Sequence, residues 1–169
     1  MSGSTIAGRR AARLAAVQAL YQMEFTGASA RQAIGEFVRH RLTDGGVAGE
    51  EADEPALEAP DRLLFAAIVE GVRARSDELD TMIASALSGD WKVERMEVLL
   101  RAILRAGAFE LFARPETPPA IIINDYVDVA HAFFAQKEPG LVNAVLDRLG
   151  RALRPEMEEG RRAGTGAAR

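Results

Sequence analysis

The chain has 169 residues, of which 48% are hydrophobic and 27% are charged, and its formal net charge is −4. This length and composition predict one globular domain, with or without tails, that buries a core without cross-links. Because the sequence contains no cysteine, it excludes disulfides, thiolate metal sites and thiol nucleophiles. It has neither an apolar run long enough for a membrane helix nor a secretory signal, so we expect a cytoplasmic protein.

The negative charge is concentrated in one segment. Seven of the 25 acidic residues lie between Asp44 and Asp61, where there is no basic residue. The first 23 residues, in contrast, carry Arg9, Arg10 and Arg13 and no acid. Because charges more than about 8–10 Å apart are largely screened at physiological salt, a distant acidic segment does not cancel this local positive charge. The pattern predicts an N-terminal surface that attracts phosphate.

Four helices and one long loop are expected in the N-terminal half. The first helix extends from about Gly8 to a stop signal at Gly27. Ser29 and Gln32 form a capping-box pattern that begins a second helix. Residues 43–59 are rich in glycine and acids, which predicts a solvated acidic loop inserted within the domain. Two further helices are expected to begin at Pro60–Asp61 and at Ser76.

The first helix has a predicted apolar side and a predicted polar side. Its apolar stripe is expected at helical spacing, at Leu14, Val17, Leu20 and Tyr21. Its polar side is expected to carry Arg10, Arg13 and Gln18. On this pattern alone, core packing is the default role of Tyr21.

Three helices are expected in the C-terminal half. The strongest helical pattern covers residues 93–113, and Pro118–Pro119 begins the next helix, which carries residues 121–134. A turn at 136–140 precedes the last helix, which Pro155 closes. Because no segment shows sustained alternation of apolar and polar residues, the sequence predicts an all-α fold with about seven helices around one core.

The sequence offers no catalytic apparatus. Asp128 lies one helical turn before His131, the spacing of a general-base pair, but the sequence places no nucleophile beside it. A satisfied surface histidine is the favoured interpretation. The chain has no metal-ligand spacing and no glycine-rich phosphate loop. We therefore expect no enzyme activity, no cofactor and no metal site.

Arg9, Arg10 and Arg13 are the more informative residues. Their spacings of three and four place them on one side of a helix start. The planar guanidinium group binds phosphate through two N–H groups and stacks on bases. A solubilising helix face explains the same pattern equally well, so both interpretations stay open at this point.

Three stretches together resemble a known family. Residues 9–22 read RRAARLAAVQALYQ, residues 99–111 read LLRAILRAGAFEL and are followed by IIINDYVDVA at 121–130, and residues 141–149 read LVNAVLDRL. Their order and spacing, which span residues 9–154, resemble the NusB family of transcription antitermination factors. The resemblance implies a compact seven-helix domain over 9–154 in two helical subbundles. Residues 1–8 are then a flexible basic N-terminal arm, and residues 155–169 are a flexible tail.

The resemblance also implies a function without catalysis. Similar proteins bind single-stranded boxA RNA together with NusE, a small-subunit ribosomal protein. The complex joins RNA polymerase and suppresses premature termination, notably in ribosomal RNA operons. This chain is accordingly expected to be an RNA-binding antitermination factor, either as a monomer or as a homodimer.

The resemblance assigns site residues to two surfaces. RNA contacts are implied for Arg9, Arg10, Arg13, Gln18, Lys137 and Asn143. The NusE side is implied for Tyr21, Leu100 and Arg105. Lys137 and Leu141 stand where relatives often have an acid and a phenylalanine, so Lys137 gains a phosphate contact and Leu141 loses base stacking. Leu100 stands where some relatives have a glutamate that meets NusE.

Two other functions stay open. A similar domain forms the N-terminal part of certain ribosomal RNA cytosine methyltransferases, whose catalytic part has a glycine-rich cofactor loop and cysteine chemistry. This chain ends at Arg169 with neither feature, so that function requires a missing catalytic part. A helical protein-interaction scaffold without an RNA role is the third hypothesis. Selective binding of a boxA-like RNA over a scrambled one discriminates among them.

Overall fold

The computed structural model describes residues 5–44 and 60–157, and of residues 41–44 it describes the backbone alone. Its elements are α1 (Ile6–Thr26), α2 (Ala30–Asp44), α3 (Arg62–Ala74), α4 (Ser76–Ala86), the short 3-10 helix η1 (Val93–Arg95), α5 (Val98–Ala113), α6 (Pro119–Phe133) and α7 (Glu138–Leu153). Within the described residues every such element is helical, which confirms the expected all-α fold with seven α-helices. No helix in these ranges is long and apolar enough to cross a membrane.

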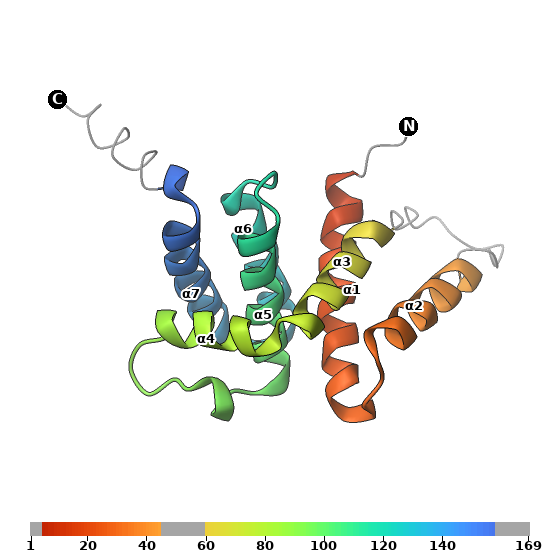
Figure 1. Ribbon diagram of the computed structural model, residues 1–169, viewed down its shortest axis with the longest axis horizontal. Coiled ribbons are helices and arrows are strands. Elements are labelled where there is room, and N and C mark those ends of the chain that lie inside the picture. The colour runs from red at the N-terminus through yellow and green to blue at the C-terminus, as the bar shows by residue number, and fades with distance from the viewer. Residues whose placement is uncertain (1–4, 45–59, 158–169) are drawn as a thin grey trace.

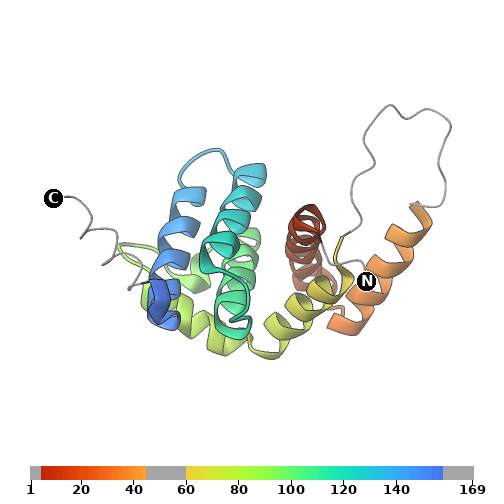
Figure 2. The same cartoon turned by 90° about the horizontal axis from the view of Figure 1, so that it is seen from above.

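The helices form two groups, which agrees with the expected two subbundles. Figure 1 shows α1, α2 and α3 on one side and α4 to α7 on the other, and the view from above in Figure 2 shows the same division. Helix α5 joins the groups because it packs against α1 and α3 and also against α4, α6 and α7. Its side chains Ile103, Leu104 and Leu111 are at most 1% exposed. The core of the molecule is therefore centred on α5.

Capping signals place several helix ends where the sequence predicts them. The Gln32 side chain accepts a hydrogen bond from the Ser29 backbone N–H at 2.9 Å, and Ser29 Oγ accepts one from the Gln32 N–H at 3.2 Å. This reciprocal pair is a capping box. The Asp61 side chain accepts from the backbone N–H of Leu64 at 3.0 Å and begins α3. Gly27 ends α1 with a φ of 68°, a conformation that favours glycine.

Two helix starts differ from the expectation. Helix α1 begins at Ile6 rather than near Gly8, because the Thr5 side chain accepts a hydrogen bond from the Gly8 N–H at 2.9 Å. Helix α5 begins at Val98 rather than at residue 93, because the extended backbone of Met96 separates it from η1. Short polar caps and single extended residues are weak signals beside a long apolar pattern.

The last helix also begins earlier than expected. Helix α7 begins at Glu138, within the expected turn at 136–140. Pro139 lies in its first turn, where the missing N–H of proline leaves no intrahelical bond unmade. Residues 1–4 of the expected arm, 45–59 of the expected acidic loop and 158–169 of the expected tail lie outside the described residues.

The buried side of α1 is rotated relative to the expected stripe. Arg13, Val17 and Leu20 follow one another at helical spacing and are 1%, 0% and 7% exposed. Leu14 is only partly buried, and Tyr21 is 36% exposed. The placement of Arg13 on the polar side is therefore wrong, and so is the core packing of Tyr21. Helix α1 packs against both α3 and α5, so the face that carries Arg13 is enclosed by its neighbours.

Polar contacts join distant parts of the chain at two places. The backbone N–H of Asp61 donates to the Gly8 carbonyl at 2.9 Å, which places the starts of α1 and α3 side by side. At the other end of the chain, Arg154 is 4% exposed and closes the C-terminal end of α5. Its guanidinium group donates to backbone carbonyls of Glu110, Leu111, Arg114, Pro115 and Thr117, at distances between 2.7 and 3.4 Å. These carbonyls include some that a helix end leaves without an intrahelical partner.

Candidate functional site

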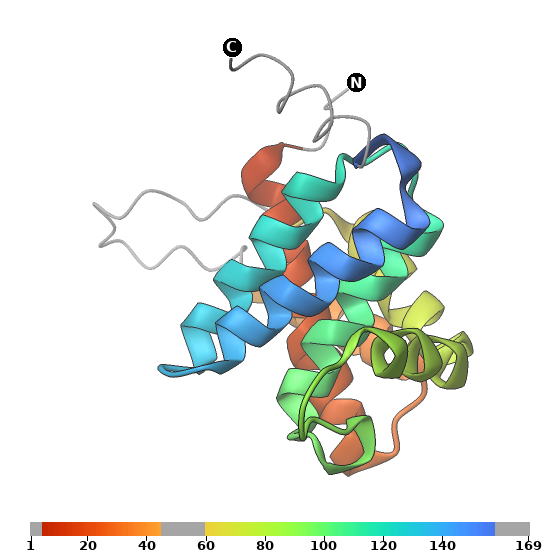
Figure 3. The same ribbon diagram turned by 90° about the vertical axis from the view of Figure 1, so that its left-hand side faces the viewer.

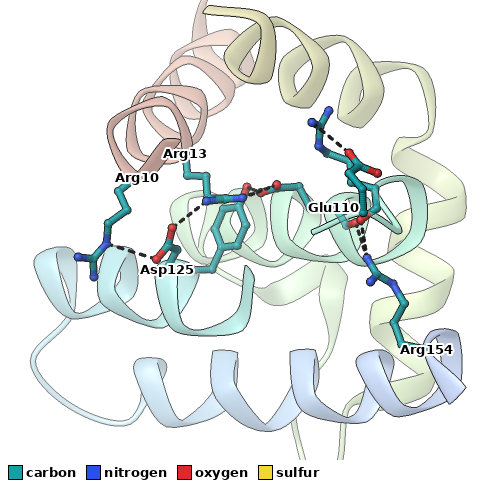
Figure 4. Close-up of polar contacts among 8 residues, drawn as sticks. Arg10, Arg13, Glu110, Asp125 and Arg154 are labelled. Carbon is teal, nitrogen blue, oxygen red and sulfur yellow. Dashed lines mark hydrogen bonds and ion pairs between the residues drawn. The ribbon is translucent and has the colours of Figure 1, made fainter. Parts of the chain in front are cut away.

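Arg13 lies at the centre of a buried polar network. Its Nε and Nη2 donate to the two carboxylate oxygens of Glu110 at 2.8 and 2.9 Å, and its Nη1 donates to Asp125 Oδ2 at 2.8 Å. The three residues come from α1, α5 and α6 (Figure 4). Burial by itself lowers the pKa of Arg13, but the hydrogen bonds to Glu110 and the nearby negative charges outweigh it and raise the pKa. Arg13 is therefore a charged structural residue.

Tyr126 completes the pairing of Glu110. Its hydroxyl donates to Glu110 Oε2 at 2.6 Å, and its side chain is fully buried. Burial raises the pKa of Tyr126 well above its usual value, and the charge and hydrogen bond of Glu110 raise it further. The neutral phenol is thus the form that donates this bond. The network contains paired charges only, as buried ionic groups require.

Arg10 extends this network to the surface. Its Nε lies 3.3 Å from Asp125 Oδ1, and its Nη2 lies 2.6 Å from Asp128 Oδ2. Asp125 therefore pairs with buried Arg13 through one oxygen and with Arg10 through the other. The side chains of Arg10 and Asp128 are 54% and 58% exposed, whereas that of Asp125 is 11% exposed. Figure 4 shows Asp125 between the two arginines.

Only two of the three arginines expected on the basic face reach the surface. Arg10 is exposed and Arg9 is half-buried, but Arg13 points into the core and is withdrawn as an RNA contact. The sequence carried a signal for this, because Arg13 precedes Val17 by four residues and Leu20 by seven, which is the apolar stripe itself. Glu110 is a second signal, since it is the single acid within the apolar helix α5.

Gln18 lies on another side of α1 from Arg10. It is exposed and lines a groove of about 320 Å³ between α1 and α2, together with Gln22 and Phe37. Arg10, in contrast, pairs with residues of α6. The structure therefore does not bring these two RNA candidates together.

Lys137 and Asn143, the remaining RNA candidates, lie apart from both Arg10 and Gln18. Lys137 directly precedes α7 and is exposed, and its Nζ lies 5.0 Å from the ring centroid of Trp91, a cation–π distance. Asn143 is exposed on α7. Figure 3 shows the turn between α6 and α7 well away from the N-terminal end of α1. A ligand that reaches both places must cross the outer face of α6.

The residues expected on the NusE side divide into exposed and buried ones. Tyr21 makes an edge-to-face contact with Phe25, with ring centroids 4.9 Å apart, and Phe25 is 66% exposed. Arg105 donates through Nε and Nη2 to Asp80 at 2.7 Å and through Nη1 to Glu24 at 3.1 Å. The hydrogen bond to Asp80 raises the pKa of Arg105.

Leu100 does not belong to a surface. It is 2% exposed and packs in the hydrophobic core. The expectation that it meets a partner is therefore wrong for this structure. Its place on α5, the helix that packs against both groups, explains the burial.

The sequence comparisons decide the family. The model of the NusB family matches residues 10–151. The chain belongs to the NusB family. The transcription antitermination protein NusB of Rhizobium rhizogenes is 46% identical over 151 residues, which cover 89% of this chain and 91% of that protein. The NusB of Sinorhizobium fredii is 48% identical over 148 residues, which cover 88% of this chain and 89% of that protein.

Solved structures of the NusB family share the fold. NusB of T. maritima matches with a TM-score of 0.59 at 23% identity, over 85% of this chain and 90% of that one. A chain in a structure of the antitermination factors NusB and NusE with double-stranded RNA matches with a TM-score of 0.62 at 22% identity, over 85% of this chain and 96% of that one. At these identities the likeness concerns the fold.

Membership of the NusB family agrees with the absence of catalytic signals in the sequence. The relatives are transcription antitermination proteins, and they are matched over about nine tenths of their length. His131 is exposed, and the carboxylate of its neighbour Asp128 pairs with Arg10. Among the described residues, no three His, Asp or Glu side chains form a group that could hold a metal ion.

Proposed function

We propose that this protein is a cytoplasmic transcription antitermination factor that binds single-stranded boxA-type RNA together with NusE. The observation that carries the proposal is the match to the NusB family over residues 10–151, with relatives of that name at 46–48% identity. The methyltransferase and scaffold hypotheses have no comparable support. In this proposal one surface of the protein binds RNA and a second surface binds NusE.

The RNA surface that we propose begins at the N-terminal basic end, which comprises Arg9, Arg10 and Arg62. Arg10 and Arg62 are exposed, and the contact between Asp61 and Gly8 holds the two helix starts together. The first turn of α1 contains no acid. A helix N-terminus also presents free N–H groups and a partial positive charge to an anion. Arg9 and Arg62 add positive charge beside Arg10, whose own charge Asp125 and Asp128 partly offset, so we propose these arginines as the phosphate contacts at this end.

A second RNA contact is proposed at Lys137 and Asn143. The Trp91 ring holds the Lys137 ammonium group over its face, while the exposed lysine stays available to a phosphate. RNA that extends from Arg10 to Lys137 passes the outer face of α6. Gln18 contacts RNA in this proposal only if the strand also enters the groove between α1 and α2.

The NusE surface that we propose is built on Tyr21 and Phe25. An exposed aromatic pair supplies the large rigid contact area that dominates many protein interfaces. Arg105 of α5 lies nearby, because it pairs with Glu24, which is on α1 together with Tyr21 and Phe25. This surface lies at the C-terminal half of α1, and the basic end lies at its N-terminal half, so one helix serves both ligands.

Fluorescence anisotropy tests the RNA function. A labelled boxA RNA and a scrambled RNA of equal composition are titrated with the protein, with and without NusE. We expect selective binding of boxA RNA that NusE strengthens. Arg10→Gln should weaken binding and reduce the slope of log K against log salt by about 0.7, the value for one phosphate on single-stranded RNA. The matched control is Arg73→Gln, at an exposed arginine in the last turn of α3. Equal affinity for both RNAs under every condition would overturn the proposal.

A further inference from the structure

Arg10 is held by two carboxylates that differ in their own surroundings. Asp125 is 11% exposed, and its second oxygen accepts a hydrogen bond from buried Arg13. Asp128 is 58% exposed and contacts Arg10 from the outer face of α6. The first carboxylate is therefore anchored to the core, and the second is free to move into solvent.

The two carboxylates occupy one edge of the Arg10 guanidinium group. Nε faces Asp125 and Nη2 faces Asp128, and these two nitrogens form one of the edges with which arginine binds phosphate through two parallel hydrogen bonds. A phosphate that approaches this edge must replace a carboxylate. Asp128 is the one that yields, because its exposed side chain can be rehydrated, whereas Asp125 is tied to Arg13.

We propose that Asp128 sets the affinity for RNA by competing with phosphate for Arg10, while Asp125 positions Arg10 at the surface. This inference rests on the proposed RNA function, and it adds a residue, Asp128, that weakens RNA binding. In the free protein the ion pair to Asp128 occupies Arg10. In the RNA complex the phosphate takes the place of that carboxylate, and Asp128 turns into solvent.

The test is a double-mutant cycle on boxA RNA binding by the full chain, measured by fluorescence anisotropy. Asp128→Asn keeps the shape of the side chain and removes its charge. We expect it to tighten binding by up to about fivefold, the range of an exposed ion pair. In an Arg10→Gln background the same substitution should change the affinity very little. An equal gain in both backgrounds indicates general charge repulsion and overturns the competition.

Glu78→Gln is the matched control, because Glu78 is also a partly exposed carboxylate paired with an arginine, Arg75, and it lies on α4, away from the proposed RNA contacts. It should leave the affinity unchanged. Thermal unfolding of each variant verifies that the fold is kept. If the wild type binds boxA RNA and Asp128→Asn binds equally well, the inference is wrong and the proposed function stands. If neither protein binds RNA, the proposed function fails, and the inference fails with it.

Discussion

Arg13 and Glu110 lie 97 residues apart in the sequence, and they form an ion pair with two hydrogen bonds in the core. The pair connects α1 of one helical group with α5 of the other. Its geometry is the planar fork of arginine against a carboxylate, the strongest arrangement available to these groups. Polar contacts as well as apolar packing therefore position the two helical groups relative to each other.

Removal of Arg13 should destabilise the fold strongly. Arg13→Met leaves the buried Glu110 without a cationic partner and leaves Asp125 with the exposed Arg10 alone, and such a loss costs about 3–5 kcal/mol. The measurement is the free energy of unfolding in urea. Arg10→Met is the control, because Arg10 is 54% exposed and its loss should cost about 1 kcal/mol or less. Equal effects of the two substitutions would contradict the buried network.

Leu100 should contribute to stability and not to partner binding. Leu100→Ala removes a side chain that is 2% exposed, and a cavity of this kind costs about 2–5 kcal/mol. Leu63→Ala, at a leucine that is 85% exposed, should have almost no effect on unfolding. Calorimetric titration of the folded Leu100→Ala protein with NusE should show unchanged affinity. Weaker NusE binding at unchanged stability would return Leu100 to the interface.

Phe25 should matter for the partner and not for the fold. Phe25→Ala removes an exposed ring that contacts Tyr21, and we expect a loss of NusE affinity of about tenfold, within the range of interface aromatics. Phe133→Ala, at another exposed phenylalanine on α6, is the matched control. The two variants should unfold at the same urea concentration as the wild type. Identical NusE affinities for both variants would place the partner elsewhere.

Tyr126 should make the stability depend on pH in the alkaline range. In the unfolded chain a tyrosine loses its proton near pH ~10, whereas burial and Glu110 raise the pKa in the folded state. Above pH ~10 the folded state therefore binds more protons than the unfolded state. The contribution of Tyr126 to the free energy of unfolding is constant below this pH and decreases as the pH rises further. Urea unfolding at several alkaline pH values should show a shallower fall in Tyr126→Phe. Tyr21→Phe, at the exposed tyrosine, should keep the steeper fall of the wild type.

The sequence predicts the fold better than it predicts the site, for physical reasons. Capping residues such as Ser29 and Asp61 act within one turn, so their role is visible from three neighbouring letters. The burial of Arg13 depends on partners 97 and 112 residues away, which periodicity within one helix does not identify. The family resemblance alone assigns Leu100 to the partner surface. Such an assignment does not reveal whether the side chain faces solvent or the core.

Arg154 has a consequence for the order in which the molecule is completed. Its guanidinium group satisfies carbonyls at the end of α5 that lie about 40 residues earlier in the chain. During synthesis, helix α5 and the turn that follows it leave the ribosome well before Arg154 does. The carbonyls at the end of α5 therefore lack these partners until Arg154 has been synthesised, so the central helix is completed only after α7 has followed it.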